Sequence, residues 1–261
     1  MKYLVLLLLL LPFSAQAALT DSLVSYWKFN ETSGDAADSH GANTLTNTNT
    51  ATYSTGHINN ACYLAEASNQ YFAVGDTASL DITGDISMSC WVYLANITEQ
   101  MLFMNKSNWD GGSNIAYVFY IDGASKLTVD LSSDGSQAVG SYHRETQSTA
   151  SVSATTWTMV TATFDVDTNN VDLYVNGSVV TSTQTYGTGV SGIHNSNQDL
   201  SIGGAATAAN DKLDGRMDEC GIWSRTLTSG EVSELYNAGS GLSYPFGSAV
   251  ASFQLWVLSL F

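Results

Sequence analysis

The sequence predicts an all-β fold, a sandwich or a barrel of antiparallel strands, and three observations support this prediction. Short β-prone runs recur along the chain with turn residues between them. One of these runs alternates apolar and polar positions with the period of a strand, and two others are joined by a tight turn. Only one segment carries the start and stop signals of a helix, so helices contribute little to the expected fold.

Eight runs are expected to form strands because they are rich in β-branched and aromatic residues and are bounded by Gly, Asn or Asp. In the run at 157–164, Val160, Ala162 and Phe164 alternate with two threonines, as expected of a strand with one buried face. The Asn- and Thr-rich stretch at 43–55 is expected to be a loop. The expected strands are 23–29, 71–74, 86–94, 115–121, 126–131, 157–164, 171–175 and 178–183.

One turn and one helix are predicted from specific residues. Asn176 and Gly177 supply the two positive-φ positions of a type I′ hairpin turn. Thr228 and Glu231 form a capping box, so a short helix is expected to begin there and to end by Gly239. The apolar residues that share one face of this helix are Val232, Leu235 and Tyr236.

The two ends of the chain differ from the rest. Lys2, an eight-residue apolar run at 4–11 and the small residues before Ala18 predict a signal peptide at 1–17. The protein is therefore expected to be secreted, extracellular or on a cell surface. That apolar run is too short to span a bilayer, which takes about 20 residues, so no transmembrane span is expected. Residues 18–246 are expected to form one domain, and the apolar stretch 247–261 an edge strand or a sticky tail.

The charge of the chain limits its partners. With 24 acidic and 8 basic residues the formal net charge is −16. A surface this anionic repels nucleic acid and anionic lipid, and it favours cations, neutral sugars or basic partners. The sequence leaves the oligomeric state open.

Three cysteines, Cys62, Cys90 and Cys220, lie in apolar runs that read as strands. An odd number cannot all pair within one chain, and buried cysteines commonly act as small apolar residues. We expect all three to be unpaired. A bridge between Cys90 and Cys220 is the alternative, because exported proteins can form disulfides.

Catalytic signatures are absent from the sequence. It contains no G-x-S-x-G and no H-E-x-x-H, and its four histidines are scattered singly. The best group of carboxylates is Asp214, Asp218 and Glu219. Asp218 and Glu219 are adjacent on an expected strand, hence on opposite faces, and could not flank one glycosidic bond. The sequence therefore predicts that the protein is not an enzyme.

Four segments follow one another in an order typical of one family. They are LVSYWKFNETSGDAADSHG from residue 23, DITGDISMSCWVYL from residue 81, TWTMVTATFDVDTNNVDLYVNGSVV from residue 156, and LSIGGAATAANDKLDGRMDECGIWSRTLTSGEVSELYNAG from residue 200. The chain thereby resembles the laminin-G-like jelly-roll domains of the concanavalin A-like lectin/glucanase superfamily, from residue 23 to about residue 246. This resemblance implies two antiparallel sheets packed face to face in a jelly-roll sandwich, with one short C-terminal helix. It also implies that the runs around Cys90 and Cys220 are neighbours in one sheet.

The resemblance further implies a calcium site. In many relatives a calcium ion ties the N-terminal loop to the closing strand, and the matching candidates here are Asp38, the backbone carbonyl of His40, and Asp218, with Glu31 and Asn43 as lesser ones. The alternative is that Asp38 and Asp218 only cap turns and strands. The Glu-x-Asp-x-x-Glu strand of hydrolytic relatives does not occur in this sequence.

A binding role then depends on exposed aromatic rings, on which sugar rings stack. Trp109, Tyr142 and Tyr186 lie in predicted loops and are the candidate ligand-binding residues, with Trp109 first because its loop is polar and Gly-rich. The other tryptophans of the expected strands are interpreted as structural: Trp27, Trp91, Trp157 and Trp223.

These observations predict a secreted, non-catalytic binding module that recognises carbohydrate in attachment or adhesion. The alternative is a protein-interaction or structural module on a surface or virion, so the partner is a glycan or a surface protein. A polysaccharide-degrading enzyme on the same fold is the remaining reading.

Overall fold

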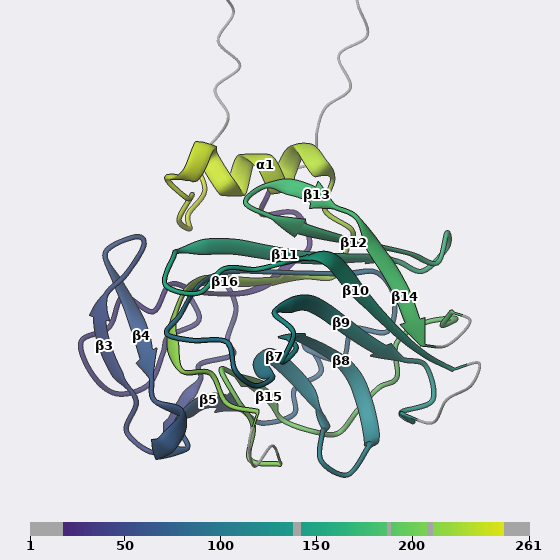
Figure 1. Cartoon of the computed structure of the whole chain (residues 1–261), viewed down its shortest axis with the longest axis horizontal. Helices are drawn as coiled ribbons and strands as arrows, with labels where there is room; N and C mark the ends of the chain where they lie inside the picture. The colour runs from purple at the N-terminus through teal and green to yellow at the C-terminus, as the bar shows by residue number, and fades with distance from the viewer. Residues whose placement is uncertain (1–17, 138–141, 187–188, 208–210, 248–261) are drawn as a thin grey trace, which may run out of the picture.

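The computed structural model describes residues 18–137, 142–186, 189–207 and 211–247. The chain forms two antiparallel sheets packed face to face, and the short helix α1 (Ser229–Tyr236) covers the outer face of one of them (Figure 1). Each sheet has eight strands within the described ranges. The predicted all-β jelly-roll sandwich with one short C-terminal helix is therefore confirmed.

The first sheet, called the helix-side sheet here, has the strand order β13-β12-β11-β6-β16-β4-β3, with β1 also paired to β16. Its strands are β1 (Leu23–Trp27), β3 (Thr52–Thr55), β4 (Asn60–Leu64), β6 (Ile86–Leu94), β11 (Thr158–Asp165), β12 (Asn170–Val175), β13 (Ser178–Val180) and β16 (Gly215–Trp223).

The second sheet, called the open sheet here, has the order β14-β10-β9-β8-β7-β15-β5-β2. Its strands are β2 (Thr46–Thr48), β5 (Tyr71–Val74), β7 (Met101–Asn108), β8 (Ser113–Ile121), β9 (Lys126–Ser132), β10 (His143–Ser151), β14 (Ser182–Tyr186) and β15 (Leu200–Ile202). Two short 3₁₀ turns, Glu66–Ser68 and Asn237–Gly239, complete the elements.

The core lies between the two sheets, where alternate residues of each strand meet. From the helix-side sheet it includes Val92, Val160 and Phe164, and from the open sheet Phe119 and Leu131. A second apolar cluster, built around Trp91 and Trp223, fills the space between the helix-side sheet and α1. Trp27, Trp91 and Trp223 are buried, as their strand positions suggested.

The local predictions hold at the turn, the helix and the cysteines. Asn176 and Gly177 both have positive φ, 51° and 75°, as the hairpin turn requires. Thr228 and Glu231 make both bonds of the capping box, and the helix ends where Asn237 turns left-handed. β6 and β16 are neighbours, yet Cys62, Cys90 and Cys220 are all free and buried, so the alternative bridge is not formed.

Three segments expected to be loops contain strands. The stretch 43–55 forms β2 and β3, and the loops around Trp109 and Tyr142 carry most of β7 and all of β10. These strands were missed because β2, β3 and β10 are polar. β2 and β3 are edge strands of their sheets, where apolar alternation is not needed for burial.

The expected signal peptide at 1–17 and all but the first residue of the tail at 247–261 lie outside the described residues. Among the residues that are described, no helix is long and apolar enough to cross a membrane.

Candidate ligand-binding site

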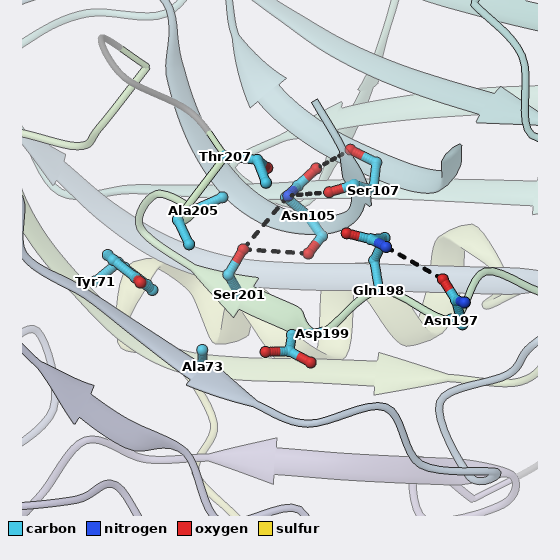
Figure 2. Close-up of a pocket in the computed structure, with 11 residues that line it drawn as sticks. Tyr71, Ala73, Asn105, Ser107, Asn197, Gln198, Asp199, Ser201, Ala205 and Thr207 are labelled. Carbon is cyan, nitrogen blue, oxygen red and sulfur yellow. Dashed lines mark hydrogen bonds between the residues drawn. The ribbon is translucent and has the colours of Figure 1, made fainter. Parts of the chain in front are cut away.

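A hollow of about 220 Å³ opens on the outer face of the open sheet, over β5, β7 and β15 (Figure 2). Small or polar residues make almost all of its lining: Tyr71, Ala73, Asn105, Ser107, Asn197, Gln198, Asp199, Ser201, Ala205, Ala206 and Thr207. We call it the polar cavity. It is smaller than the roughly 300–1,000 Å³ that houses a drug-sized ligand, so it suits one small ring.

Strand register places the floor of the polar cavity. Ser201 of β15 lies opposite Ala73 of β5 on one side and opposite Asn105 of β7 on the other. Residues opposite one another in an antiparallel pair share a face of the sheet. Leu200 and Ile202, on either side of Ser201, point into the core, so Ser201 and its row face outward.

The floor is polar but only loosely bonded within itself. The Asn105 amide donates to Ser201 Oγ at 3.4 Å and to the Ser107 carbonyl at 3.3 Å, both longer than the usual 2.9–3.0 Å. The one short bond runs from Ser107 Oγ to Asn105 Oδ1, at 2.5 Å. Because the long bonds are weak, these amide and hydroxyl groups can exchange them for bonds to a ligand's hydroxyls.

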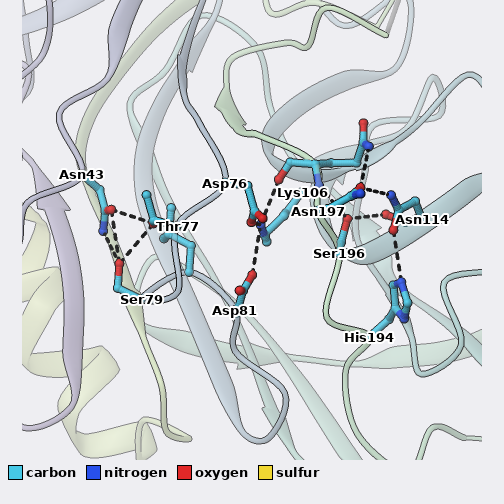
Figure 3. A network of polar contacts seen from close by, with 12 residues as sticks. Asn43, Asp76, Thr77, Ser79, Asp81, Lys106, Asn114, His194, Ser196 and Asn197 are labelled. Atoms are coloured by element: carbon cyan, nitrogen blue, oxygen red, sulfur yellow. Dashed lines mark hydrogen bonds and ion pairs between the residues drawn. The ribbon is translucent and has the colours of Figure 1, made fainter.

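Lys106 anchors the rim of the polar cavity from behind. This fully buried lysine lies 2.6 Å from Asp76 and 3.3 Å from Asp81, and it donates to the backbone carbonyl of Gln198 at 2.9 Å (Figure 3). The backbone of Gln198 is therefore held by a buried charge, in addition to the bond from its N–H to Ser196 Oγ. Because the rim is already ordered, less conformational entropy is lost when a ligand binds.

Asn114 holds the same segment from the side of β8. Its carbonyl accepts a hydrogen bond from Ser196 Oγ at 2.6 Å, and its side-chain oxygen lies 3.1 Å from His194 Nε2 (Figure 3). The Asn114 amide also bonds Asn197, whose side chain lines the cavity. The segment from His194 to Gln198 is thus bonded to β8 at its first residue and to β7 at its last.

The opposite rim depends on a bend directly after β15. Gly203 has a φ of +77°, and a Cβ at this position would lie 2.1 Å from the Leu64 side chain. Only glycine fits such a close approach with a left-handed backbone. The bend leads Ala205, Ala206 and Thr207 over the cavity, and their small side chains keep it open.

The chemistry of the lining favours a neutral, hydroxyl-rich ligand. The floor offers uncharged donors and acceptors from Asn105, Ser107 and Ser201, and Tyr71 provides an aromatic wall. The one ionised group of the lining is the exposed carboxylate of Asp199, which accepts hydroxyl hydrogen bonds but repels anions. Polar groups of this kind on a shaped surface orient a ligand and give specificity.

With this fold and site in place, comparison with known proteins gives the family. The family model described as the concanavalin A-like lectin/glucanases superfamily matches residues 66–233, well over half of the chain. The chain belongs to this superfamily. No curated protein sequence matches it.

Several solved structures of the same fold are titled as binding domains, and another is titled as a complex with arabinotriose. The binding domain of Paraclostridial Mosquitocidal Protein 1 has a TM-score of 0.65 at 17% identity, covering 85% of this chain and 53% of its own. Domain 4 of AbnA, a GH43 extracellular arabinanase from Geobacillus stearothermophilus solved in complex with arabinotriose, has a TM-score of 0.59 at 18% identity, covering 82% and 97%. The binding domain of Botulinum Neurotoxin DC, in complex with SialylT, has a TM-score of 0.59 at 11% identity, covering 85% and 52%. This member of the superfamily thus spans about half the length of the toxin binding domains.

Of the predicted ligand-binding aromatic residues, Trp109 lies beside the polar cavity without lining it, because it packs against a cluster that includes Ala205 of the lining. Trp109 is half-buried, with its indole N–H bonded to Asp211 at 2.8 Å and its ring edge-on to Tyr120. Tyr142 is 58% exposed at the start of β10. Tyr186 ends β14, and its side chain lies outside the described residues. Neither Trp109 nor Tyr142 lines the cavity, so their role in binding stays a prediction.

The predicted calcium ligands differ in how far their oxygens are already hydrogen-bonded. Asp38 Oδ1 accepts the backbone N–H groups of Tyr26, His40 and Gly41, while its Oδ2 accepts that of Asn43. The Asn43 side chain, buried, is bonded to Ser25, Thr77 and Ser79. His40 is exposed beside Tyr244.

Asp218 and Glu31 fit an ion better, because each has one buried carboxylate oxygen without a hydrogen-bond partner in the described ranges. Nevertheless, the described residues contain no group of three or more His, Cys, Asp or Glu side chains placed to hold a metal. Calcium also binds backbone carbonyl oxygens, such as the predicted His40 carbonyl, so a calcium requirement stays a prediction.

Asp218 and Glu219 lie at a bulge in β16, where the pairing with β6 shifts between Asp218 and Gly221. Glu219 has a φ of +49°, so strict alternation of faces does not hold here, contrary to the expectation from the sequence. Burial raises the pKa of Asp218 to about 8 and that of Glu219 to about 7. Glu219 is enclosed by Tyr26, Trp91 and Trp223 beneath α1.

Sequence reasoning missed the polar cavity because its floor residues are small or polar and come from three strands that are distant in sequence. Asn105 and Ser107 look like loop residues, and Ser201 lies in a three-residue strand. Two features of the sequence could have pointed there: Gly203 followed by Gly204 marks a bend, and Lys106 is a lone cation two residues after the apolar run at 101–104.

Proposed function

We propose that the protein is a secreted, non-catalytic module that binds a neutral carbohydrate in the polar cavity and so serves attachment or adhesion. The observation that carries the proposal is the outward-facing row of Ala73, Ser201 and Asn105, with a fixed polar rim around it. The superfamily and the binding-domain titles of the structural relatives support it.

The proposal that the module is non-catalytic rests on the chemistry of the cavity. Glycoside hydrolysis needs two carboxyl groups across one bond, and the lining of the cavity contains only Asp199. The raised pKa of Asp218 and Glu219 would suit general acids, but both side chains are buried, with Glu219 enclosed beneath α1.

The test is a glycan array followed by titration of the best neutral glycan into the mature chain and two variants. Asn105→Ala removes the central amide of the floor, and we expect the dissociation constant to rise at least tenfold, the range for losing buried hydrogen bonds to a ligand. Tyr142→Ala is the matched control because this exposed ring lies outside the cavity. Loss of binding in Tyr142→Ala but not in Asn105→Ala would show that the glycan binds at the loop of Tyr142, which the sequence predicted, and not in the polar cavity.

Recognition of a protein is the second candidate function. One structure of the same fold, again a Botulinum neurotoxin DC binding domain, is titled as a complex with rat synaptotagmin II, at 12% identity and a TM-score of 0.61. An array that retains no glycan with the folded chain would favour this second candidate.

A further inference from the structure

A second hollow, of about 350 Å³, lies on the outer face of the other sheet, the helix-side sheet, over β3, β4, β16 and β6. It is lined by two tyrosines, one arginine and four small residues: Thr52, Ser54, Tyr63, Tyr93, Ala95, Gly215 and Arg216. We call it the arginine hollow. It lies on the opposite side of the sandwich from the polar cavity.

Strand register arranges these side chains in one row across four strands. Thr52 of β3 lies opposite Tyr63 of β4, Tyr63 lies opposite Arg216 of β16, and Arg216 lies opposite Tyr93 of β6. Cross-strand partners share a face, so the row is a flat platform with the guanidinium between two rings. Tyr63 is 41% exposed, which leaves its ring open to a ligand.

Arg216 is held in place by rings and not by an acid. Its guanidinium carbon lies 4.2 Å from the centroid of Tyr93 and 5.5 Å from that of Trp157, and Nη1 donates to the Thr55 carbonyl at 2.8 Å. No carboxylate of the described residues lies within 4.0 Å of it. The guanidinium therefore has no acidic partner to displace when an anion binds.

A second polar atom in the same hollow also lacks a partner. Ser54 lines the hollow, and its Oγ is buried without any hydrogen bond in the described ranges. Buried hydroxyls normally have a hydrogen-bond partner. An unpaired hydroxyl in the same hollow as a guanidinium without an acidic partner indicates that a bound ligand supplies the missing polar group.

We propose that the arginine hollow binds a sugar that carries a carboxylate, with Arg216 pairing with the carboxylate and Tyr63 and Tyr93 contacting the ring. Arginine matches a carboxylate with two parallel hydrogen bonds, and this pairing is stronger than bonds between neutral groups. Salt screens the net negative charge of the rest of the protein beyond roughly 8 Å, whereas a direct ion pair is screened much less. This inference goes beyond the proposed function, since it adds a second site, on the other sheet, that binds an anionic sugar and not a neutral one.

The test compares two probes that differ only at one carbon, methyl β-D-glucuronide and methyl β-D-glucoside. Each is titrated into the mature chain while the amide, indole and guanidinium signals are followed by NMR. We expect saturable shifts at Arg216, Tyr93 and Trp157 with the glucuronide and at least about tenfold weaker binding of the glucoside. Arg216→Gln should weaken glucuronide binding by a similar factor, and Arg216→Lys should recover part of it.

Two further variants separate the possible outcomes. Tyr63→Ala changes an exposed ring, so it tests the hollow even if Arg216→Gln does not fold. Asn105→Ala should leave glucuronide binding unchanged, so that failure of the polar cavity and failure of the arginine hollow are distinguishable. Equal affinity for the two probes, shifts that lie elsewhere, or glucuronide binding that survives both Arg216→Gln and Tyr63→Ala would overturn the proposal.

Discussion

At the scale of single residues, the buried carboxyls of the β16 bulge make stability depend on pH. Asp218 and Glu219 have pKa values raised by burial to about 8 and about 7, whereas in an unfolded chain both lie near 4. The folded state then holds more protons than the unfolded state between about pH 4 and pH 8. Folding is therefore favoured at the acidic end of this window, and stability falls as pH rises through it.

We expect the free energy of unfolding, measured by urea denaturation in EGTA, to fall by up to about 7 kcal/mol between pH 5 and pH 8, since one pKa unit corresponds to about 1.4 kcal/mol and the pKa values of Asp218 and Glu219 lie about three and about two units above pH 5. Asp218→Asn should flatten this slope because an amide does not titrate. Asp165→Asn is the control, because hydrogen bonds from Thr168 lower the pKa of that exposed carboxyl and keep its titration below the window. Parallel curves for the wild type and Asp218→Asn would show that Asp218 does not titrate in this range.

The same bulge gives a direct test of calcium. An ion at Asp218 would bind the ionised carboxylate, so adding calcium at pH 8 would raise the melting temperature of the wild type and not that of Asp218→Asn. The sequence identified Asp218 as a ligand by resemblance alone. Its burial follows from the bulge, and no local sequence signal predicts a left-handed glutamate at position 219.

At the scale of elements, the central strand β7 links the core to the rim of the polar cavity through Lys106. Replacement by Met in Lys106→Met keeps the apolar stem but removes the bonds to Asp76, Asp81 and the Gln198 carbonyl. We expect a loss of about 2–4 kcal/mol in the free energy of unfolding, since a buried ion pair is broken while Asp76 and Asp81 keep some contact with solvent. Affinity for a neutral glycan should fall as well, because the rim loses its anchor.

The matched control is Lys126→Met on β9, a lysine without a carboxylate partner among the described salt bridges. It removes the same charge with little expected change in stability. Equal effects of the two substitutions on melting temperature and on glycan affinity would show that these properties depend on the net charge of the protein and not on the buried bonds of Lys106.

Elements with strong local signals were predictable from the sequence, whereas polar strands were not. The hairpin turn at Asn176–Gly177 and the helix after Thr228 have the expected form because one or two residues determine each of them. β7 and β10 were placed in loops because β10 and the second half of β7, residues 105–108, are polar, and neither strand alternates apolar with polar positions. Since the polar cavity is built on β5, β7 and β15, this error concealed it.

At the scale of the whole molecule, the sandwich leaves two outer surfaces for recognition. One carries the polar cavity, with an exposed carboxylate on its rim, and the other carries Arg216 between two aromatic rings. The sequence predicted the class of fold. It could not predict the sites, because cross-strand rows such as Ala73, Ser201 and Asn105 join residues distant in sequence, and only the strand order brings them together.

The most direct test of the central claim is a crystal structure of the mature chain with the neutral glycan that it retains best on an array. We predict an intact sugar ring seated over β5, β7 and β15, with hydroxyl groups bonded to Asn105, Ser201 and Gln198. A ring bound anywhere else on the molecule, or a glycan found cleaved, would contradict the claim that the polar cavity is the binding site of a non-catalytic module.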